Sequence, residues 1–272
     1  HTVGLAAYLK DGVMQQRGID KAVEILGEFQ AFLLSFQITE VTAFTTAALR
    51  NAKNSKAAVS EIEQRTGLSV RVITGDEEAV FDFIGATRNL SENSGLLLDI
   101  GGGSTEIVTY QQRMIQHKIS LPMGSLAFRT KYVQGILPTE AECLVMRQKA
   151  EEAIRSATAF ESVNESFIAG IGGTFKGAAA LYNAMFNQPA SNTRMEARRL
   201  KTIIGTFQQD HGMTQEMSIM LMRTVPDRIN TIIPGLIIAD VLARQFQSKI
   251  VTYSDSGVRE GYIYDQIIGK KQ

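Results

Sequence analysis

Three consecutive glycines between two carboxylates constrain the fold of this chain more than any other stretch. The apolar run Leu96–Leu98 precedes Asp99, the glycines Gly101–Gly103 follow, and Glu106 closes the segment. A short apolar run bounded by glycine is typical of a buried strand. Because Asp99 lies where that strand ends, its burial requires a cation or convergent hydrogen-bond donors. Glycines can take positive φ, so the N–H groups of this loop can line a concavity that binds an anion.

The residues after the glycines indicate which kind of loop this is. Glu106–Tyr110 and Ile115–Leu121 are predicted strands, and the polar Gln111–Arg113 between them is a predicted turn. The loop then joins strand to strand, whereas a P-loop or a dinucleotide fingerprint would open a helix. A tight turn with a solvated Asp99 is the plain structural alternative. The buried strand and the second acid seven residues on favour anion binding.

A second glycine loop has the opposite context, because it opens a helix. The short buried strand Ser166–Ala169 leads into Gly170–Gly177, and a helix is predicted over Ala178–Met185. The N–H groups and the dipole at a helix start point at one spot, which suits an anion. The side chain of Lys176 could reach the same anion.

Composition excludes several classes of site. The 272 residues contain 28 basic and 28 acidic side chains, so a polyanion would have to be held by local focusing of charge. The single cysteine, Cys143, cannot form an internal disulfide, and so few thiols favour a cytoplasmic protein. Three scattered histidines argue against a histidine-rich metal centre and favour a hard, oxygen-ligated ion. We find no signal peptide and no apolar run of membrane-spanning length in this sequence.

The first third of the chain alternates strands with helices, which predicts parallel pairing with right-handed crossovers. The expected elements are a strand Thr2–Leu9, a helix from Asp20 to about Phe36, a strand Glu40–Phe44, a helix Ser55–Thr66 ended by Gly67, a strand Leu68–Ile73, and a helix from Gly75 to about Arg88. The first helix carries an apolar stripe that predicts a core-facing side, formed by Ala22, Ile25, Leu26, Phe29, Phe32, Leu33 and Phe36.

The polar segment Ser91–Gly95 is the expected link between two domains, 1–94 and 95–272. In the second domain, a capping box at Thr139–Glu142 predicts a helix to about Ser162. A basic helical stretch over Arg194–Lys201 is interpreted as a solvated face rather than a polyanion-binding groove. The remaining expected elements are an apolar helix to about Phe246, a strand Lys249–Tyr253, and a final helix after the turn Ser254–Gly257.

Six segments, in order and at fitting spacing, resemble the Ppx/GppA family of exopolyphosphatases and guanosine pentaphosphate phosphohydrolases. They are TTAALR (45–50), GDEEA (75–79), DIGGGSTE (99–106), GGTFK (172–176), IPG (233–235) and SDSGVREG (254–261). The resemblance covers nearly the whole chain. It implies an α/β fold with two ribonuclease-H-like domains around a phosphate-binding cleft, as in the actin-like ATPase superfamily.

The resemblance also implies roles for individual residues. Glu78 matches the glutamate that activates the attacking water, with an N-terminal helix charge as its plain structural alternative, and Arg50 matches an arginine that faces the phosphates. Asp99 and Glu106 match ligands of Mg²⁺ or another hard divalent cation. The phosphate-binding residues carried over are Gly101, Gly102, Gly103, Ser104, Thr105, Gly172, Gly173, Thr174 and Lys176. Val80 stands where the family usually has arginine.

The implied activity is hydrolysis of terminal phosphoanhydride bonds of inorganic polyphosphate or guanosine pentaphosphate, with release of orthophosphate by Mg²⁺-assisted attack of water. These substrates are the implied partners, with no nucleic acid and no membrane, and a homodimer is left open. Two other hypotheses remain at this stage. One is a phosphotransferase of the same superfamily, and the other is a non-catalytic sensor of polyphosphate or alarmone.

One part of the family pattern is not found here. The family opens with a hairpin that carries an Asp-Leu-Gly-Ser/Thr-Asn loop, and this sequence contains no such motif. The segment His1–Leu9 resembles the strand that follows that hairpin. The expectation is therefore that the natural protein carries such a segment before His1.

Overall fold

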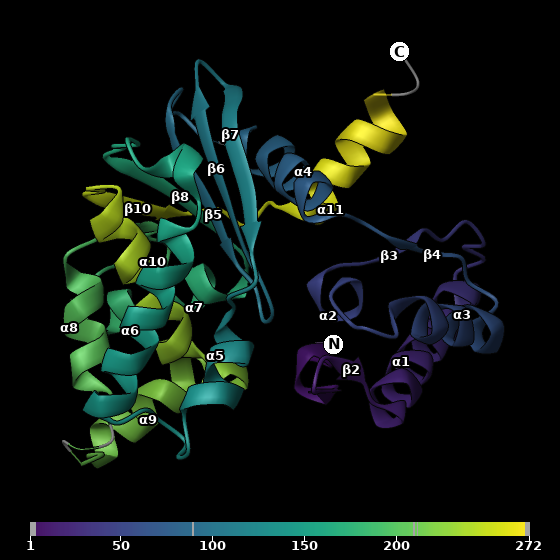
Figure 1. Cartoon of the computed structure of the whole chain (residues 1–272), viewed down its shortest axis with the longest axis horizontal. Helices are drawn as coiled ribbons and strands as arrows, with labels where there is room; N and C mark the ends of the chain where they lie inside the picture. Colours follow the sequence, from purple (N-terminus) through teal and green to yellow (C-terminus); the bar gives the residue numbers. More distant parts are fainter. Residues whose placement is uncertain (1–3, 89, 209, 211, 270–272) are drawn as a thin grey trace. The chain divides into compact units, whose positions relative to one another are not determined.

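A computed structural model describes residues 4–88, 90–208, 210 and 212–269 of the chain (Figure 1). Contacts between Cα atoms divide the chain into two compact units, His1–Gly75 (unit 1) and Asp76–Gln272 (unit 2). The domain boundary predicted between residues 94 and 95 stays a prediction. Each unit is described by itself below.

Unit 1 is a small α/β unit in which two helices pack together beside a two-stranded parallel sheet. Strands β3 and β4 pair in register, with Ala43 opposite Val70. Helices α1 and α3 enclose most of the buried core of this unit, which includes Ile19, Val59 and Ile62. The elements in chain order are the 3₁₀ helix η1 (Leu5–Tyr8), β1 (Leu9–Lys10), β2 (Val13–Met14), α1 (Gln16–Ser35), β3 (Ala43–Thr45), α2 (Ala47–Arg50), α3 (Ser55–Thr66) and β4 (Val70–Val72).

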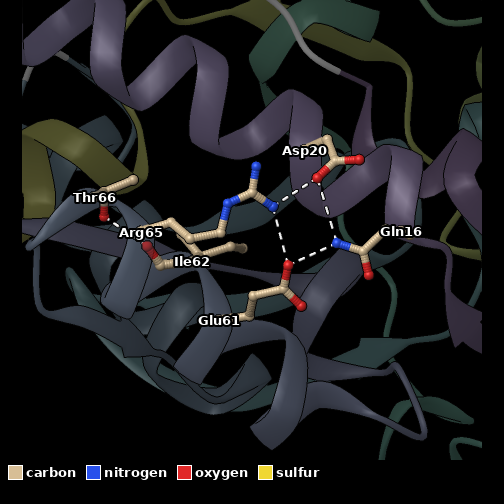
Figure 2. Close-up of polar contacts among 6 residues, drawn as sticks. All are labelled: Gln16, Asp20, Glu61, Ile62, Arg65 and Thr66. Carbon is tan, nitrogen blue, oxygen red and sulfur yellow. Dashed lines mark hydrogen bonds and ion pairs between the residues drawn. The ribbon is translucent and has the colours of Figure 1, made fainter.

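Polar side chains join the exposed sides of α1 and α3, as Figure 2 shows. The guanidinium of Arg65 donates to Asp20 at 2.6 Å and to Glu61 at 2.9 Å, and the amide of Gln16 donates to Glu61 at 2.6 Å. Exposed pairs of this kind each contribute little to stability. The network therefore fixes the register between the two helices, while apolar packing supplies most of the stability.

Two predictions for unit 1 are wrong. The strand expected over Thr2–Leu9 is a 3₁₀ helix at Leu5–Tyr8, with only Leu9 entering a short hairpin, while its first two residues lie outside the described residues. Helix α1 begins four residues before the predicted N-cap Asp20, with Gln15 at the N-cap position. Asp20 is instead part of the contact with α3, a tertiary role that the local sequence does not indicate.

The predicted apolar stripe of α1 is buried only along its first half. Ala22 and Ile25 are buried, whereas Phe29, Phe32 and Phe36 are 42%, 60% and 64% exposed. A helix of 20 residues is about 30 Å long. The buried core of unit 1 reaches only the first half of the stripe, and in the second half the rings of Phe32 and Phe36 pack on each other at 5.1 Å.

Unit 2 is built on a six-stranded mixed sheet, with strand order β7-β6-β5-β8-β10-β9. Strands β5, β8 and β10 are parallel, whereas β6, β7 and β9 each pair antiparallel with their neighbours. The hairpins β5-β6 and β6-β7 confirm the predicted strand-to-strand context of the first glycine loop. The strands are β5 (Gly95–Ile100), β6 (Thr105–Gln111), β7 (Met114–Leu121), β8 (Phe167–Ile171), β9 (Arg194–Glu196) and β10 (Ile250–Tyr253).

Helices cover both faces of this sheet, as Figure 1 shows for α4 on one side and for α6, α8 and α10 on the other. Successive strand residues point to opposite faces, so Leu96 and Leu98 join the larger core while Leu97 joins the smaller one against α4. The helices of unit 2 are α4 (Gly75–Thr87), α5 (Ser125–Tyr132), α6 (Glu140–Arg155), α7 (Gly172–Met185), α8 (Arg199–Thr206), α9 (Gln215–Thr224), α10 (Ile232–Gln245) and α11 (Val258–Tyr262).

Local signals at helix ends are confirmed. The side chain of Thr139 accepts from the N–H of Glu142 at 3.2 Å, and the Glu142 carboxylate accepts from the N–H of Thr139 at 2.8 Å, which is the predicted capping box. Gly67 ends α3 with a φ of 71°. A left-handed conformation at a helix end costs glycine little, since it has no Cβ.

The basic stretch Arg194–Lys201 is not one helix, which corrects the prediction. Its first residues form β9 at the edge of the sheet, where Met195 pairs with Val251, and α8 begins only at Arg199. Pairing with β10 buries Met195 and overrides the helical pattern. Among the described helices, none combines the length and the apolar character that a membrane span requires.

Candidate active site

Four carboxylates gather on the α4 face of the sheet. Asp99 and Glu106 are directly opposite each other in the β5-β6 ladder, so their side chains share one face. Glu78 and Asp82 are four residues apart on α4, which places both on the same side of the helix. Helix α4 packs on that same face, with Ala79 and Phe83 in its core. The fold therefore directs four acids from three elements toward one place.

Three of these acids lie close enough to share one cation. A carboxylate oxygen from each of Asp82, Asp99 and Glu106 lies within 4.8 Å of the other two, and we call these residues the acid cluster. The Asp82 side chain is fully buried, and within the described residues only the backbone N–H of Val258 approaches its carboxylate as a donor. Such burial of an unpaired carboxylate is costly, so the site calls for a positive group.

The sequence analysis did not identify Asp82 as a site residue. Its one signal is the spacing of four residues from Glu78, which would place both carboxylates on one helix face. That spacing alone is common on exposed helices and indicates no site. Only the packing of α4 on the sheet brings Asp82 to the end of β5.

Burial and the repulsion between neighbouring carboxylates raise the pKa values of two acids in this site. Loss of hydration raises the pKa of Asp82 well above its ordinary value, and the neighbouring carboxylates raise it further. The pKa of Asp99 is raised in the same way, by burial first and then by the charges of Glu106 and Glu78, while the charge of Arg228 opposes the shift. A bound cation would favour the ionised forms of these groups.

Glu106 is held in place by hydroxyl groups. Its Oε1 accepts hydrogen bonds from Ser104 at 2.8 Å and from Ser120 at 2.6 Å. Both donors lie on the β6-β7 side of the sheet, and Glu106 is only 1% exposed. The carboxylate therefore has a fixed orientation toward the acid cluster.

The first glycine loop, Gly101–Ser104, follows the acid cluster directly and offers free donors. Helix α5 holds the backbone of this loop, because the carbonyls of Gly101 and Gly102 accept from the N–H groups of Ser125 and Ala127 at 2.8 and 2.9 Å. The N–H groups of Gly102, Gly103 and Ser104 donate to no group within the described part of the chain. Three adjacent donors of this kind form a concavity suited to an anion. None of these glycines has the positive φ that the sequence analysis allowed for.

The second glycine loop, Gly170–Gly177, reaches the same acids. Gly172 has a φ of 76°, and a Cβ built there would lie 2.6 Å from Oδ1 of Asp99. Helix α7 begins at Gly172, so the first N–H groups of this helix have no intrahelical acceptor. The structure thus brings the two predicted loops together at Asp99, one after β5 and one after β8.

Arg228 is a second residue that sequence reasoning missed. A Cβ built on Gly173 would lie 1.9 Å from Nη2 of Arg228, so the guanidinium lies directly against the second loop. Arg228 comes from the 3₁₀ helix η4 (Pro226–Arg228), about fifty residues further along the chain. Within the described residues its side chain makes no ion pair or hydrogen bond. A cation therefore faces the loop with its donors available.

Comparison with known proteins identifies the family of this chain. The model of the Ppx/GppA phosphatase family matches residues 1–268. The chain belongs to the Ppx/GppA phosphatase family. It is 27% identical over 258 residues to exopolyphosphatase 1 of Mycobacterium tuberculosis, covering 93% of this chain and 74% of that protein. It is 26% identical over 274 residues to the guanosine-5'-triphosphate,3'-diphosphate pyrophosphatase of Pseudoalteromonas atlantica, covering 99% and 53%.

A solved structure supports the fold assignment. The crystal structure of the Ppx/GppA family member of Aquifex aeolicus superposes with a TM-score of 0.75 at 23% identity, covering 100% of this chain and 89% of the other. The predicted family and the predicted α/β fold class are both confirmed. The role of each site residue stays a prediction.

Not every predicted residue of this Ppx/GppA chain presents its side chain to the acid cluster. The hydroxyl of Thr105 donates to the carbonyl of Met123 at 2.7 Å, and that of Thr174 donates to the carbonyl of Ile100 at 2.7 Å. Both hydroxyls hold the loops in place. Thr105 lies within β6 and pairs with both β5 and β7, so its N–H belongs to the sheet, and only the N–H of Thr174, in the first turn of α7, is left for a ligand. The side chain of Lys176 is exposed on α7.

Among the predicted site residues, Arg50 alone belongs to unit 1. It ends α2 and is half-buried, and its guanidinium donates to the carbonyl of Ile73 at 3.3 Å. That contact ties α2 to the segment after β4. Its role at the phosphates stays a prediction.

The Ser254–Gly261 motif of the family packs closely against α4. A Cβ on Gly261 would lie 1.7 Å from the carbonyl oxygen of Phe81, and one on Gly85 would lie 2.2 Å from that of Gly257. The two backbones are therefore in direct contact, with the rings of Phe81 and Tyr262 packed edge to face. This contact sets the distance of α4, and hence of its acids, from the chain that follows β10.

Proposed function

We propose that this protein hydrolyses terminal phosphoanhydride bonds of inorganic polyphosphate or guanosine pentaphosphate and releases orthophosphate. The observation that carries the proposal is the meeting of the acid cluster with two glycine loops at Asp99. Phosphoryl transfer depends mainly on positioning and on electrostatic stabilisation of the phosphoryl oxygens. A site that combines backbone donors with carboxylates for a cation supplies both requirements. The names of the two relatives agree with both substrates.

The acid cluster fits a hard divalent cation. Its donors are all carboxylate oxygens, and within the described residues the fully buried Asp82 has at most one hydrogen-bond donor beside it, the N–H of Val258. Oxygen-only donor sets suit Mg²⁺ rather than softer metals. We propose that Asp82, Asp99 and Glu106 hold Mg²⁺, which would neutralise charge on the phosphoryl oxygens when bound.

Glu78 is the proposed general base. It is 6% exposed and lies in the first turn of α4, one turn before Asp82. A general base must reach the water whose proton it takes, and a carboxylate in the first turn projects from the end of the helix rather than from its middle. Glu78 would accept this proton as water attacks the terminal phosphorus and the phosphoanhydride bond breaks.

The phosphate side of the site would consist mainly of backbone donors. The N–H groups of Gly102 and Gly103 and those at the start of α7 would bind the terminal phosphate, and the unpaired guanidinium of Arg228 would add a charged donor. Arginine suits this role because its planar group binds phosphate oxygens in pairs. Arg50 would contribute from unit 1, as the family resemblance implies.

The sensor and phosphotransferase hypotheses are less well supported. A sensor would bind phosphate without the buried carboxylates, which are costly to keep unless they act. The relatives reported above are named as an exopolyphosphatase and a pyrophosphatase, and neither is named as a phosphotransferase. A homodimer and a cytoplasmic location stay predictions.

Phosphate release from polyphosphate and from guanosine pentaphosphate, with Mg²⁺ and with EDTA, tests the proposal. Glu78→Gln should lower kcat by roughly 10²–10⁴ because a positioned general base is lost, while phosphate binding stays near that of the wild type. The matched control is Asp76→Asn, an exposed acid in the same helical turn, which should keep wild-type activity. A decrease below about tenfold in Glu78→Gln would exclude the proposed base. No release from either substrate by the wild type would overturn the activity itself.

A further inference from the structure

A cavity of about 390 Å³ lies among α6, α8 and α10, within unit 2. These helices pack on the sheet face opposite to α4, so the cavity is separate from the acid cluster. A volume of this size falls within the usual range for small-molecule sites. Its lining combines three cationic side chains with an exposed leucine and one acid: Arg147, Lys201, Arg244, Leu144 and Glu140.

A buried carboxylate fixes two of the three cations. Asp240 on α10 has a side chain that is only 4% exposed, and its Oδ2 accepts from the guanidinium groups of both Arg147 and Arg244. Each guanidinium has five N–H donors, and one carboxylate oxygen occupies a single donor of each. Nε of Arg244 also donates to the backbone carbonyl of Asp240 at 3.4 Å, so both arginines line the cavity in positions that are set before a ligand binds.

Lys201 adds a third positive charge at the same end. The C-terminal end of α8 meets the start of α6, because the side chain of Gln208 hydrogen-bonds to Cys143 and Asp210 accepts from the N–H of Glu140. Lys201, at the start of α8, and Arg147, two turns into α6, both line the cavity away from that shared end. Within the described residues the Lys201 amine makes no ion pair or hydrogen bond.

The other end of the cavity has a different character. Glu140 lies two turns before Arg147 on α6, about 10 Å away along the helix. Leu144 between them is 61% exposed and forms an apolar wall with Ile204. Burial raises the pKa of the Cys143 thiol, so the thiol stays neutral and adds no negative charge. The cavity is thus cationic at one end, apolar in the middle and acidic at the other end.

We propose that this cavity binds a nucleoside monophosphate, with its phosphate at Arg147, Lys201 and Arg244. The length of the cavity along α6 is comparable to that of an extended nucleotide. The base would pack against Leu144, and its N–H groups would donate to the Glu140 carboxylate. This site is independent of the proposed hydrolysis and does not require it.

Calorimetric titration of the full chain with AMP and with GMP tests the proposal. Ribose 5-phosphate and the free nucleosides serve as probes for the two ends of the cavity. We expect Lys201→Gln and Arg244→Gln each to weaken nucleotide binding about tenfold, the effect of one lost charge-assisted hydrogen bond. Both side chains are exposed, so these variants should fold, and thermal melting checks this. The control Arg223→Gln removes an exposed arginine of α9 outside the cavity and should bind like the wild type.

Each outcome decides the assignment. Weaker nucleotide binding in both cavity variants, with wild-type binding in the control, supports it. Binding of ribose 5-phosphate equal to that of AMP and GMP would remove the base-binding half of the proposal. No binding of either nucleotide to the wild type at millimolar concentration, or equal binding in all three variants, would overturn it. A failure of polyphosphate hydrolysis would leave these results unaffected.

Discussion

The two glycine loops of unit 2 both approach Asp99, yet they need glycine for different reasons. In the second loop glycine is a steric requirement: a Cβ on Gly170 would lie 2.3 Å from the buried ring of Phe175, and Gly172 has a φ of 76°. In the first loop the nearest atom to a Cβ on Gly102 is Cβ of Leu126 at 3.6 Å, an ordinary contact. Close packing thus explains the second loop, whereas an open backbone with unpaired N–H groups explains the first.

This difference shows that a run of glycines does not reveal its own purpose. Both runs look alike in sequence, because each follows a buried apolar strand. The tertiary contacts of each position decide whether an added side chain would unfold the unit or obstruct a ligand. Substitutions in the two loops should therefore separate stability from phosphate binding.

The largest expected effect is on stability, at Gly170. Gly170→Ala should lower the free energy of unfolding by about 1–3 kcal/mol, because the added methyl group overpacks the core against Phe175. Urea unfolding measures the change. The control Gly205→Ala, at a helical position where a Cβ meets nothing within 4 Å, should be neutral or more stable by up to about 1 kcal/mol. Equal stability of Gly170→Ala and the wild type would contradict the steric account of the second loop.

At Gly102 we expect the opposite result, with little change in stability and weaker binding of the substrate. Gly102→Val should leave the free energy of unfolding within about 0.5 kcal/mol of the wild type. It should raise KM for polyphosphate about tenfold, because the new side chain blocks the approach of phosphate to the loop N–H groups. Unfolding curves and phosphate release on the same preparation measure the two effects. Wild-type KM in a folded variant would remove the first loop from the phosphate site.

The buried carboxyl group of Asp82 should make the stability of the protein depend on pH. The raised pKa of Asp82 means that the folded state binds more protons than the unfolded state above the ordinary pKa of about 3.9. In EDTA the stability contributed by this group should therefore be lost as pH rises from about 4 through the raised pKa. Thermal melting from pH 4 to pH 8 should show a shallower fall for Asp82→Asn. Added Mg²⁺ should reduce the fall in the wild type, and identical slopes for both proteins would contradict the account.

The smallest expected effect concerns Gly173 and Arg228. Gly173→Ala should fold normally, because the atoms in its way belong to the end of a flexible arginine side chain. Displacement of the guanidinium should raise KM for polyphosphate about threefold. Arg228→Gln should have a similar effect, and the double variant should add little to it, since both changes remove one interaction. Fully additive changes in KM would show that the two residues act separately.

The sequence by itself determined the parts of this protein that depend on neighbouring residues. The capping box at Thr139, the glycine that ends α3 at Gly67 and the hairpins that follow Asp99 were predicted correctly, because each depends on groups close in the chain. The family motifs likewise marked both glycine loops, and they assigned Asp99 and Glu106 to one expected metal site.

Only the tertiary structure decided which side chains reach the site. Asp82 joins the acid cluster because α4 packs on the sheet, and Arg228 reaches Gly173 from a distant 3₁₀ helix. Other tertiary contacts turn the hydroxyls of Thr105 and Thr174 onto the backbone carbonyls of Met123 and Ile100. Local sequence cannot predict such positions, because they depend on how elements far apart in the chain pack together.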